Sequence, residues 1–134
     1  MLLNLHVKNL ALIDEIEVEF SEGLNVLTGE TGAGKSIIIG SINIALGGKV
    51  SKDIIRNGAE FALVELTFLV ETDEQKNAIE NLGITLEEDL LVISRKITKG
   101  RTINRVNGET VNVSMLKSIA DILIDIHGQK VFLQ

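Results

Sequence analysis

An eight-residue segment from Gly29 to Ser36, GETGAGKS, constrains this chain more than any other part of its sequence. It matches the phosphate-binding P-loop pattern G-x-x-x-x-G-K-[ST] at every fixed position. The glycines let such a loop curl so that successive backbone N–H groups point inward and surround an anion. The segment therefore predicts a loop between a buried strand and a helix that binds the phosphates of a nucleotide.

Each position of this loop has an expected role, with ATP and Mg²⁺ as the predicted ligands. The residues predicted to surround the phosphates are Gly29, Glu30, Thr31, Gly32, Ala33, Gly34, Lys35 and Ser36. The Lys35 ammonium is expected to reach the β- and γ-phosphates, and the Ser36 hydroxyl to be a magnesium ligand. The alternative is a glycine-rich turn between a strand and a helix, in which the lysine is simply solvated.

The segments on either side of the loop suit a P-loop. Residues 24–28, LNVLT, form a short apolar run that predicts a buried strand. Residues 36–46, SIIIGSINIAL, predict a helix that ends at Gly47-Gly48, although their β-branched isoleucines weaken the helix propensity.

The rest of the chain mixes strands with short helices. Alternating apolar and polar residues predict strands at 3–7, 16–20 and 62–70, and another strand is predicted at 90–97. Asn107-Gly108, between INRV and ETVNV, is typical of a hairpin turn. Residues 73–82 predict a polar helix that stops at Gly83, and residues 49–60 a loop or an irregular turn.

A last helix is predicted by an apolar stripe at three- and four-residue steps. Its members are Leu116, Ile119, Leu123 and Ile126, with Ser114 as the expected cap and Gly128 as the end. Within it, residues 122–125 (ILID) also resemble the apolar strand and acid that hold magnesium in P-loop enzymes. The helix is favoured, because a strand there would leave Leu116 and Ile119 unexplained. The alternative is a small self-contained P-loop kinase or GTPase that uses Asp125.

Composition limits the function classes. The chain has 134 residues, 45% of them hydrophobic and 24% charged, as expected of one soluble domain. Its net charge of -6 gives no support for direct DNA binding, since nucleic-acid-binding domains are usually basic. It has no cysteine, signal peptide or long apolar run, so a cytoplasmic protein with no disulfide framework is expected. It also has no Trp or Tyr on which a base could stack.

Several segments together resemble one protein family. VKNLALIDEIEVEF, GLNVLTGETGAGKSIIIGSINIALGG, IIRNGAE and LIDIHGQ resemble the N-terminal head segment of the RecN family, over essentially the whole chain. RecN proteins are bacterial DNA double-strand-break repair proteins and SMC-like members of the ABC ATPase superfamily. The fold class implied is α/β, a P-loop NTPase of the ABC/SMC type, with an antiparallel β-subdomain.

The resemblance implies that residues 1–134 are the N-terminal lobe of a split ATPase head. A coiled coil and a C-terminal lobe, carrying the signature, the acidic motif and the catalytic glutamate, would lie outside this chain. ATP would drive dimerisation of two heads, and water would then attack the γ-phosphorus in line. The implied partners are the protein's own C-terminal lobe, a second head and DNA, with no membrane, in a nucleoid-associated protein. This segment alone is expected to be inactive, and a rival is a module that binds nucleotide without hydrolysing it.

The resemblance also assigns single residues. Gln129, in a Q-loop near 128–134, would bind magnesium or orient the attacking water; without the resemblance it reads as an exposed residue after a helix. Some SMC-like ATPases place a basic residue after an N-F/L pair, facing the nucleotide, but here Ala11 follows Asn9-Leu10. Lys8 could substitute, or could be solvated.

Three more residues have two readings each. Arg56 and Arg95 are near elements that could contact nucleotide or DNA, which would give them a functional role. The alternative is that each forms an ion pair on the surface. His127 is expected to be a helix-end residue favoured by the helix dipole rather than a catalyst.

Overall fold

The computed structural model describes residues 1–20 and 32–125. Its strands are β1 (Leu2–Leu10), β2 (Ile13–Glu19), β3 (Phe61–Leu69), β4 (Leu90–Thr98), β5 (Thr102–Val106) and β6 (Glu109–Val111). Its helices are α1 (Gly32–Ala45), the 3₁₀ helix η2 (Lys52–Ile54), α2 (Asp73–Asn81) and α3 (Val113–Asp125). The predicted strand at 24–28 lies outside the described residues.

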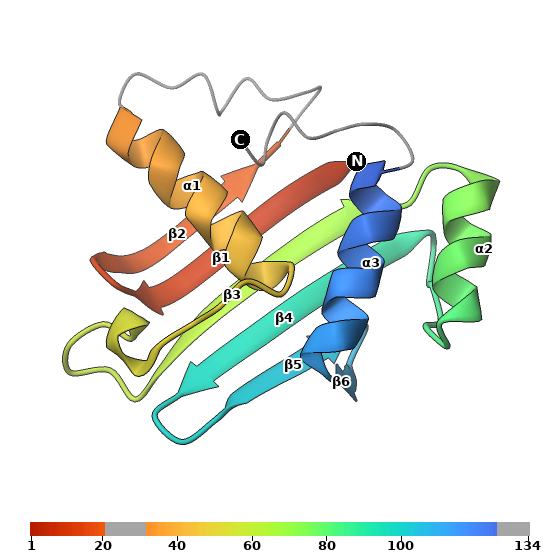
Figure 1. The fold of residues 1–134 in the computed structure, drawn as a ribbon. Coiled ribbons are helices and arrows are strands. Elements are labelled where there is room, and N and C mark those ends of the chain that lie inside the picture. Colours follow the sequence, from red (N-terminus) through yellow and green to blue (C-terminus); the bar gives the residue numbers. More distant parts are fainter. Residues whose placement is uncertain (21–31, 126–134) are drawn as a thin grey trace.

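Within the described residues the strands form a six-stranded sheet in the order β2-β1-β3-β4-β5-β6 (Figure 1). All neighbouring pairs in this sheet are antiparallel. The four strands predicted at 3–7, 16–20, 62–70 and 90–97 are confirmed, with ends that differ by a few residues. The hairpin turn is confirmed as well, because Asn107 and Gly108 connect β5 to β6 with positive φ angles of 49° and 86°.

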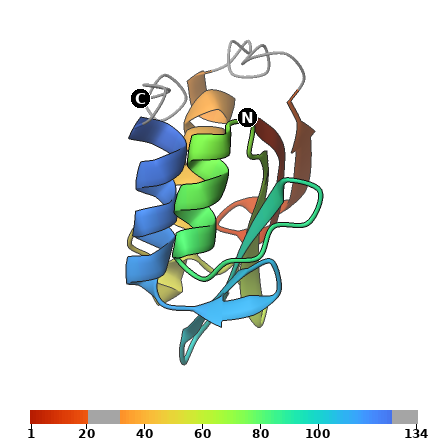
Figure 2. The ribbon, with the colours of Figure 1, turned by 90° about the vertical axis from the view of Figure 1, so that its right-hand side faces the viewer.

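The helices α1, α2 and α3 lie on one side of the sheet (Figure 2). Alternate residues of β3 and β4 point to this side and are buried, while those between them are half-buried on the open face. The core therefore sits between the sheet and the helices. Its fully buried side chains include Leu5, Val7, Ile42, Val64, Leu66, Leu91, Ile93, Leu116 and Ile119. In the described ranges no helix combines the length and the apolar character needed for a membrane span.

Two local predictions need correction, and one is refined. Residues 52–54, within the segment predicted as a loop or an irregular turn, form the short 3₁₀ helix η2. Helix α1 begins at Gly32 rather than at residue 36, so the second half of the GETGAGKS motif is already helical. Asn112, not Ser114, caps α3: its Oδ1 accepts the Met115 N–H at 2.8 Å, one of the free donors at a helix start.

Candidate functional site

The predicted phosphate site lies at the amino end of α1. Gly32–Lys35 form the first turn of this helix, whose leading N–H groups have no partner inside the helix and favour an anion. The next side chain, Ser36, is exposed. Gly29, Glu30 and Thr31 lie outside the described residues, and the side-chain position of Lys35 is not described. Backbone donors at a helix start, an ammonium and a hydroxyl are the donor set that suits a magnesium-bound triphosphate.

The other end of α1 is fixed to the sheet by Arg95. This side chain comes from β4, faces the helices and is only 2% exposed. Its Nη1 donates to the carbonyl oxygens of Ile44 at 2.6 Å and Gly48 at 2.8 Å, and its Nε donates to Asn104 Oδ1 at 2.9 Å. Burial lowers the pKa of the Arg95 guanidinium.

Both readings of Arg95 from the sequence are therefore wrong. It is neither a surface ion pair nor a residue placed to meet nucleotide or DNA. A cation at a helix carboxyl end is favourable, because unpaired carbonyl groups and the helix dipole are negative there. Gly47 (φ 108°) and Gly48 complete this end, with the Gly48 N–H donating to the Asn43 carbonyl at 2.9 Å.

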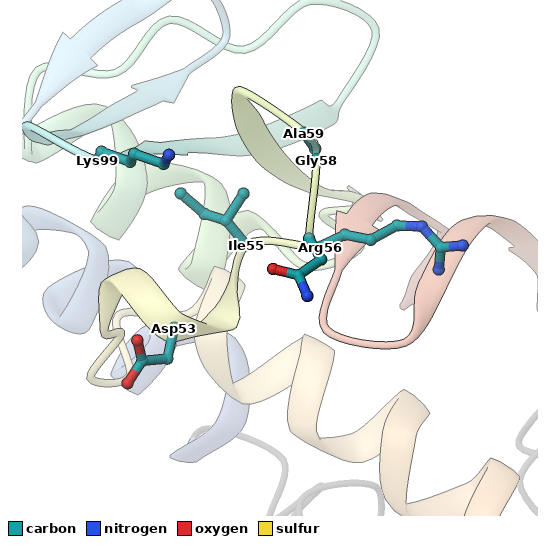
Figure 3. A pocket seen from close by; sticks show the side chains of 7 residues that line it. Asp53, Ile55, Arg56, Gly58, Ala59 and Lys99 are labelled. Atoms are coloured by element: carbon teal, nitrogen blue, oxygen red, sulfur yellow. The ribbon is translucent and has the colours of Figure 1, made fainter.

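Arg56 is fixed to the turn between β1 and β2. Its backbone N–H donates to the Asn9 carbonyl at 2.9 Å, and its Nη1 donates to the Leu12 carbonyl at 3.0 Å. Figure 3 shows the Arg56 side chain extending to this turn, away from Lys99. Asn9 and Ala11 have left-handed φ angles of 56° and 52°, so the turn is sharply bent and held by Arg56.

An open hollow of about 400 Å³ lies beside Arg56 (Figure 3). Its lining side chains include Asp53, Ile55, Asn57 and Lys99. The hollow brings a carboxylate and two cationic side chains to one surface. No prediction from the sequence placed Lys99 beside Arg56, because they are far apart along the chain.

Lys8 points away from the helices. It is exposed on β1 and pairs in register with Glu15 and Leu63, whereas its neighbour Val7 faces the covered side. A nucleotide at the amino end of α1 would lie on the other side of the sheet. The suggestion that Lys8 replaces the basic residue missing at Ala11 is therefore wrong.

His6 also lies on the open face, between two carboxylates. Its Nε2 lies 2.7 Å from Glu15 Oε2, and its Nδ1 lies 3.5 Å from Glu65 Oε1. The hydrogen bond to Glu15 is the main reason that the pKa of His6 is raised, and partial burial opposes it. This cluster belongs to the sheet surface and not to the phosphate site.

The helix predicted around Asp125 is confirmed, since α3 extends to that residue. A kinase or GTPase that held magnesium through Asp125 would need this residue at the end of a strand. Asp125 lies in a helix instead, so this alternative does not fit the structure. Ile126, His127, Gly128 and Gln129 lie outside the described residues, and the roles assigned to them remain predictions.

The chain matches the family model described as "AAA domain" over residues 4–132. Curated relatives include the DNA repair protein RecN of Halalkalibacterium halodurans and that of Bacillus subtilis, each 44% identical over 131 residues. RecN of Rickettsia prowazekii is 43% identical over 129 residues. Each match covers 96% of this chain but 23% of the relative. The resemblance inferred from the sequence is confirmed.

Solved structures show the same fold. One comes from a study of ATP-driven dimerisation and DNA-stimulated activation of SMC ATPases, with a TM-score of 0.71, 24% identity, and coverage of 92% of this chain and 79% of that chain. An SMC head bound to the C-terminal winged-helix domain of ScpA has a TM-score of 0.68 and 24% identity, covering 90% of this chain and 40% of that one. RecF has a TM-score of 0.61 and 15% identity, covering 87% and 29%. The predicted fold class, the N-terminal lobe of an SMC-type head, is confirmed.

Proposed function

We propose that this chain, which belongs to the AAA domain family, is the ATP-binding lobe of an SMC-like ATPase head that acts in DNA double-strand-break repair and recombination. One observation carries the proposal: the GETGAGKS motif leads directly into α1, and α1 packs on a sheet of the SMC-head type. The RecN relatives supply the biological setting.

In the proposed site, residues 29–36 surround the triphosphate of ATP. Lys35 would neutralise charge on the β- and γ-phosphates, and the Ser36 hydroxyl and the Gln129 amide oxygen would hold Mg²⁺. When bound, the metal would supply further positive charge to balance the phosphates. Gln129 also orients the attacking water. A neutral amide suits this place because it adds no negative charge beside the γ-phosphate.

Hydrolysis requires more than this lobe. The chain spans 23% of the length of the curated relatives it matches, and Asp125 lies in helix α3 rather than at the end of a strand. We therefore assign residues 1–134 to one lobe of a split head. The coiled coil, the C-terminal lobe with its signature and acidic motifs, and a second head would come from the rest of the protein and from its dimer partner.

DNA contact is assigned to other parts of the full-length protein. The net charge of this chain is -6, and binding to the DNA backbone depends on Lys and Arg. ATP-driven head dimerisation is then the contribution of this lobe to repair. We place the protein in the bacterial cytoplasm, associated with the nucleoid, because its curated relatives are bacterial DNA repair proteins.

The proposal is tested by phosphate release from the full-length protein, beside the chain of residues 1–134. The full-length protein should hydrolyse ATP, and the 134-residue chain should show negligible turnover. Gln129→Ala should lower kcat by roughly ten-fold or more, because the water is no longer held in line. ATP affinity should change less, since water can replace one neutral metal ligand.

Two results would contradict this proposal. Multiple turnovers by the 134-residue chain, abolished by Asp125→Asn, would favour a self-contained enzyme. ATP binding without turnover in the full-length protein would instead favour a module that uses nucleotide only as a structural ligand.

A further inference from the structure

Two Asn-Gly dipeptides lie in turns of this fold. Asn57-Gly58 lies between η2 and β3, and Asn107-Gly108 connects β5 to β6. An asparagine that precedes glycine loses its side-chain amide more readily than other asparagines, because glycine has no Cβ to shield its backbone nitrogen. The two dipeptides are chemically identical, so any difference in their reactivity comes from the structure around them.

The side chain of Asn107 is held at both ends of its amide. Its Oδ1 accepts the Val92 N–H at 2.8 Å, and its Nδ2 donates to the carbonyl oxygens of Thr85 at 2.8 Å and Leu90 at 3.2 Å. The residue is also half-buried. Turning this amide toward the Gly108 nitrogen would break all of these hydrogen bonds.

Asn57, in contrast, is exposed, and so is Gly58. Among the residues that the structure describes, none forms a hydrogen bond with the Asn57 side chain. One backbone hydrogen bond closes its turn, from the Ala59 N–H to the Arg56 carbonyl at 3.0 Å. A Cβ placed on Gly58 would meet no atom within 4 Å, so the space around this glycine is open to water.

We propose that Asn57 is a site of spontaneous deamidation in the folded protein and that Asn107 is protected from the same reaction. The rate of an intramolecular reaction depends on how readily the two reacting atoms reach the geometry of attack. At Asn57 only an exposed turn has to rearrange, whereas Asn107 must first lose its three side-chain hydrogen bonds. This inference goes beyond the proposed function and does not depend on nucleotide binding.

The reaction needs only this chain and water. The Gly58 nitrogen forms a bond to Cγ of Asn57, and the bond from Cγ to Nδ2 breaks. The proton of the Gly58 N–H leaves with the amide group as ammonia, and a succinimide ring remains. Water then opens the ring by cleaving one of the two bonds to the Gly58 nitrogen. Cleavage of the bond to Cγ gives aspartate at position 57, and cleavage of the bond to the main-chain carbonyl carbon gives isoaspartate.

Both products alter the turn that positions Arg56. Each places a carboxylate in the hollow that Lys99 also lines (Figure 3). Isoaspartate also adds a carbon to the main chain within the turn that the Ala59–Arg56 hydrogen bond closes. The next contact is the Arg56 N–H, which donates to the Asn9 carbonyl at 2.9 Å. Deamidation should therefore loosen the attachment of this segment to the β1–β2 turn.

The test measures both dipeptides in one sample of the full-length protein, incubated at mildly alkaline pH, which favours loss of the glycine N–H proton. Lysyl endopeptidase separates the two sites into peptides 53–76 and 100–117. Fragment mass spectra then give the fraction of each asparagine whose amide has become a carboxyl group. In the folded protein, deamidation at Asn57 should be at least about ten-fold faster than at Asn107.

Two controls separate structure from sequence. In protein unfolded by guanidinium, Asn57 and Asn107 should react at similar rates, because the hydrogen bonds of Asn107 are gone. The matched variant Asn57→Gln keeps an amide but would have to form a larger ring, so it should stop the reaction at position 57 and leave Asn107 unchanged. After the same incubation, the Arg56 amide should exchange hydrogen about ten-fold faster in deamidated wild type than in Asn57→Gln.

Equal rates at the two sites in the folded protein, or a faster reaction at Asn107, would overturn the proposal. Absence of deamidation at Asn57 in the folded protein would overturn it as well, whatever the unfolded chain does. Unchanged exchange of the Arg56 amide after deamidation would overturn the loosening of the turn. Because these measurements use no nucleotide, their failure would leave the proposed ATP-binding function standing.

Discussion

Arg95 illustrates how one residue can hold the carboxyl end of the P-loop helix. Its guanidinium lies among the carbonyl oxygens of Ile44 and Gly48 and the amide oxygen of Asn104, with 2% of the residue exposed. Removing it would leave buried acceptors without a donor, which costs more than the net value of the hydrogen bonds themselves. The position of α1 on the sheet therefore depends on this side chain.

We predict that Arg95→Met lowers the free energy of local opening at the carboxyl end of α1 by about 2–4 kcal/mol. Hydrogen exchange of the Gly47 and Gly48 amides in the full-length protein measures this quantity. Arg105→Met, at an exposed position on the neighbouring strand β5, is the control and should change it by less than about 0.5 kcal/mol. Equal effects of the two substitutions would show that Arg95 does not hold the carboxyl end of α1 in place.

His6 makes the sheet surface sensitive to pH. Its hydrogen bond to Glu15 raises its pKa above 6.5, and the weaker contact to Glu65 acts in the same direction. Protonated His6 stabilises the folded state through its contacts with Glu15 and Glu65. Because the folded-state pKa of His6 is raised, this contribution to folding stability is fully present below pH 6.5 and is lost as the pH rises through the folded-state pKa.

NMR titration of the His6 imidazole should therefore give a pKa above 6.5. Glu15→Gln should lower this pKa, and Glu65→Gln should lower it less, since the Glu65 contact is 3.5 Å and the Glu15 contact 2.7 Å. If Glu15→Gln left the titration unchanged, the assigned cause of the raised pKa would be wrong.

At the scale of elements, local patterns predicted most strands and helices correctly. Alternation along 62–70 located β3, the strand predicted at 90–97 is β4, and Asn107-Gly108 located the β5–β6 hairpin. The order of the strands could not be read from the sequence, because it depends on contacts between distant segments. Arg95 was misread for the same reason: its partners Ile44 and Gly48 lie 51 and 47 residues away and bind it through backbone oxygens.

The candidate site was predictable only in part. The GETGAGKS motif can be recognised locally because a P-loop is one continuous segment. An apolar hollow between the β1–β2 turn and α1 could not be predicted, because it joins Leu12 to Ile37, which are far apart in the sequence. Leu12 is 91% exposed on that turn.

The start of α3 provides a test at this scale. Asn112 and Ser114 both have side chains suited to helix capping, but only the Asn112 side chain accepts a hydrogen bond from the first turn, at 2.8 Å from the Met115 nitrogen. Asn112→Ala should therefore destabilise the first turn of α3 by about 1 kcal/mol, and Ser114→Ala by less than about 0.5 kcal/mol. Hydrogen exchange of the Met115 and Leu116 amides measures both. A larger effect at Ser114 would restore the cap predicted from the sequence.

At the scale of the whole molecule, the described residues form a sheet covered on one side by helices, and α1 begins within the P-loop motif. Solved SMC heads share this fold, and the curated RecN relatives are about four times as long as the part matched here. These features explain why one chain can hold a complete phosphate-binding motif while hydrolysis is assigned to a larger assembly.

The central claim is that residues 29–36 bind the triphosphate, and calorimetric titration of ATP with magnesium into the full-length protein tests it most directly. Wild type and Lys117→Ala, which removes an exposed lysine on α3, should bind ATP equally well. Lys35→Ala should abolish binding or weaken it greatly while the protein stays folded, because the ammonium that balances the phosphate charge is gone. Unchanged ATP affinity in Lys35→Ala would contradict the assignment of this loop as the nucleotide site.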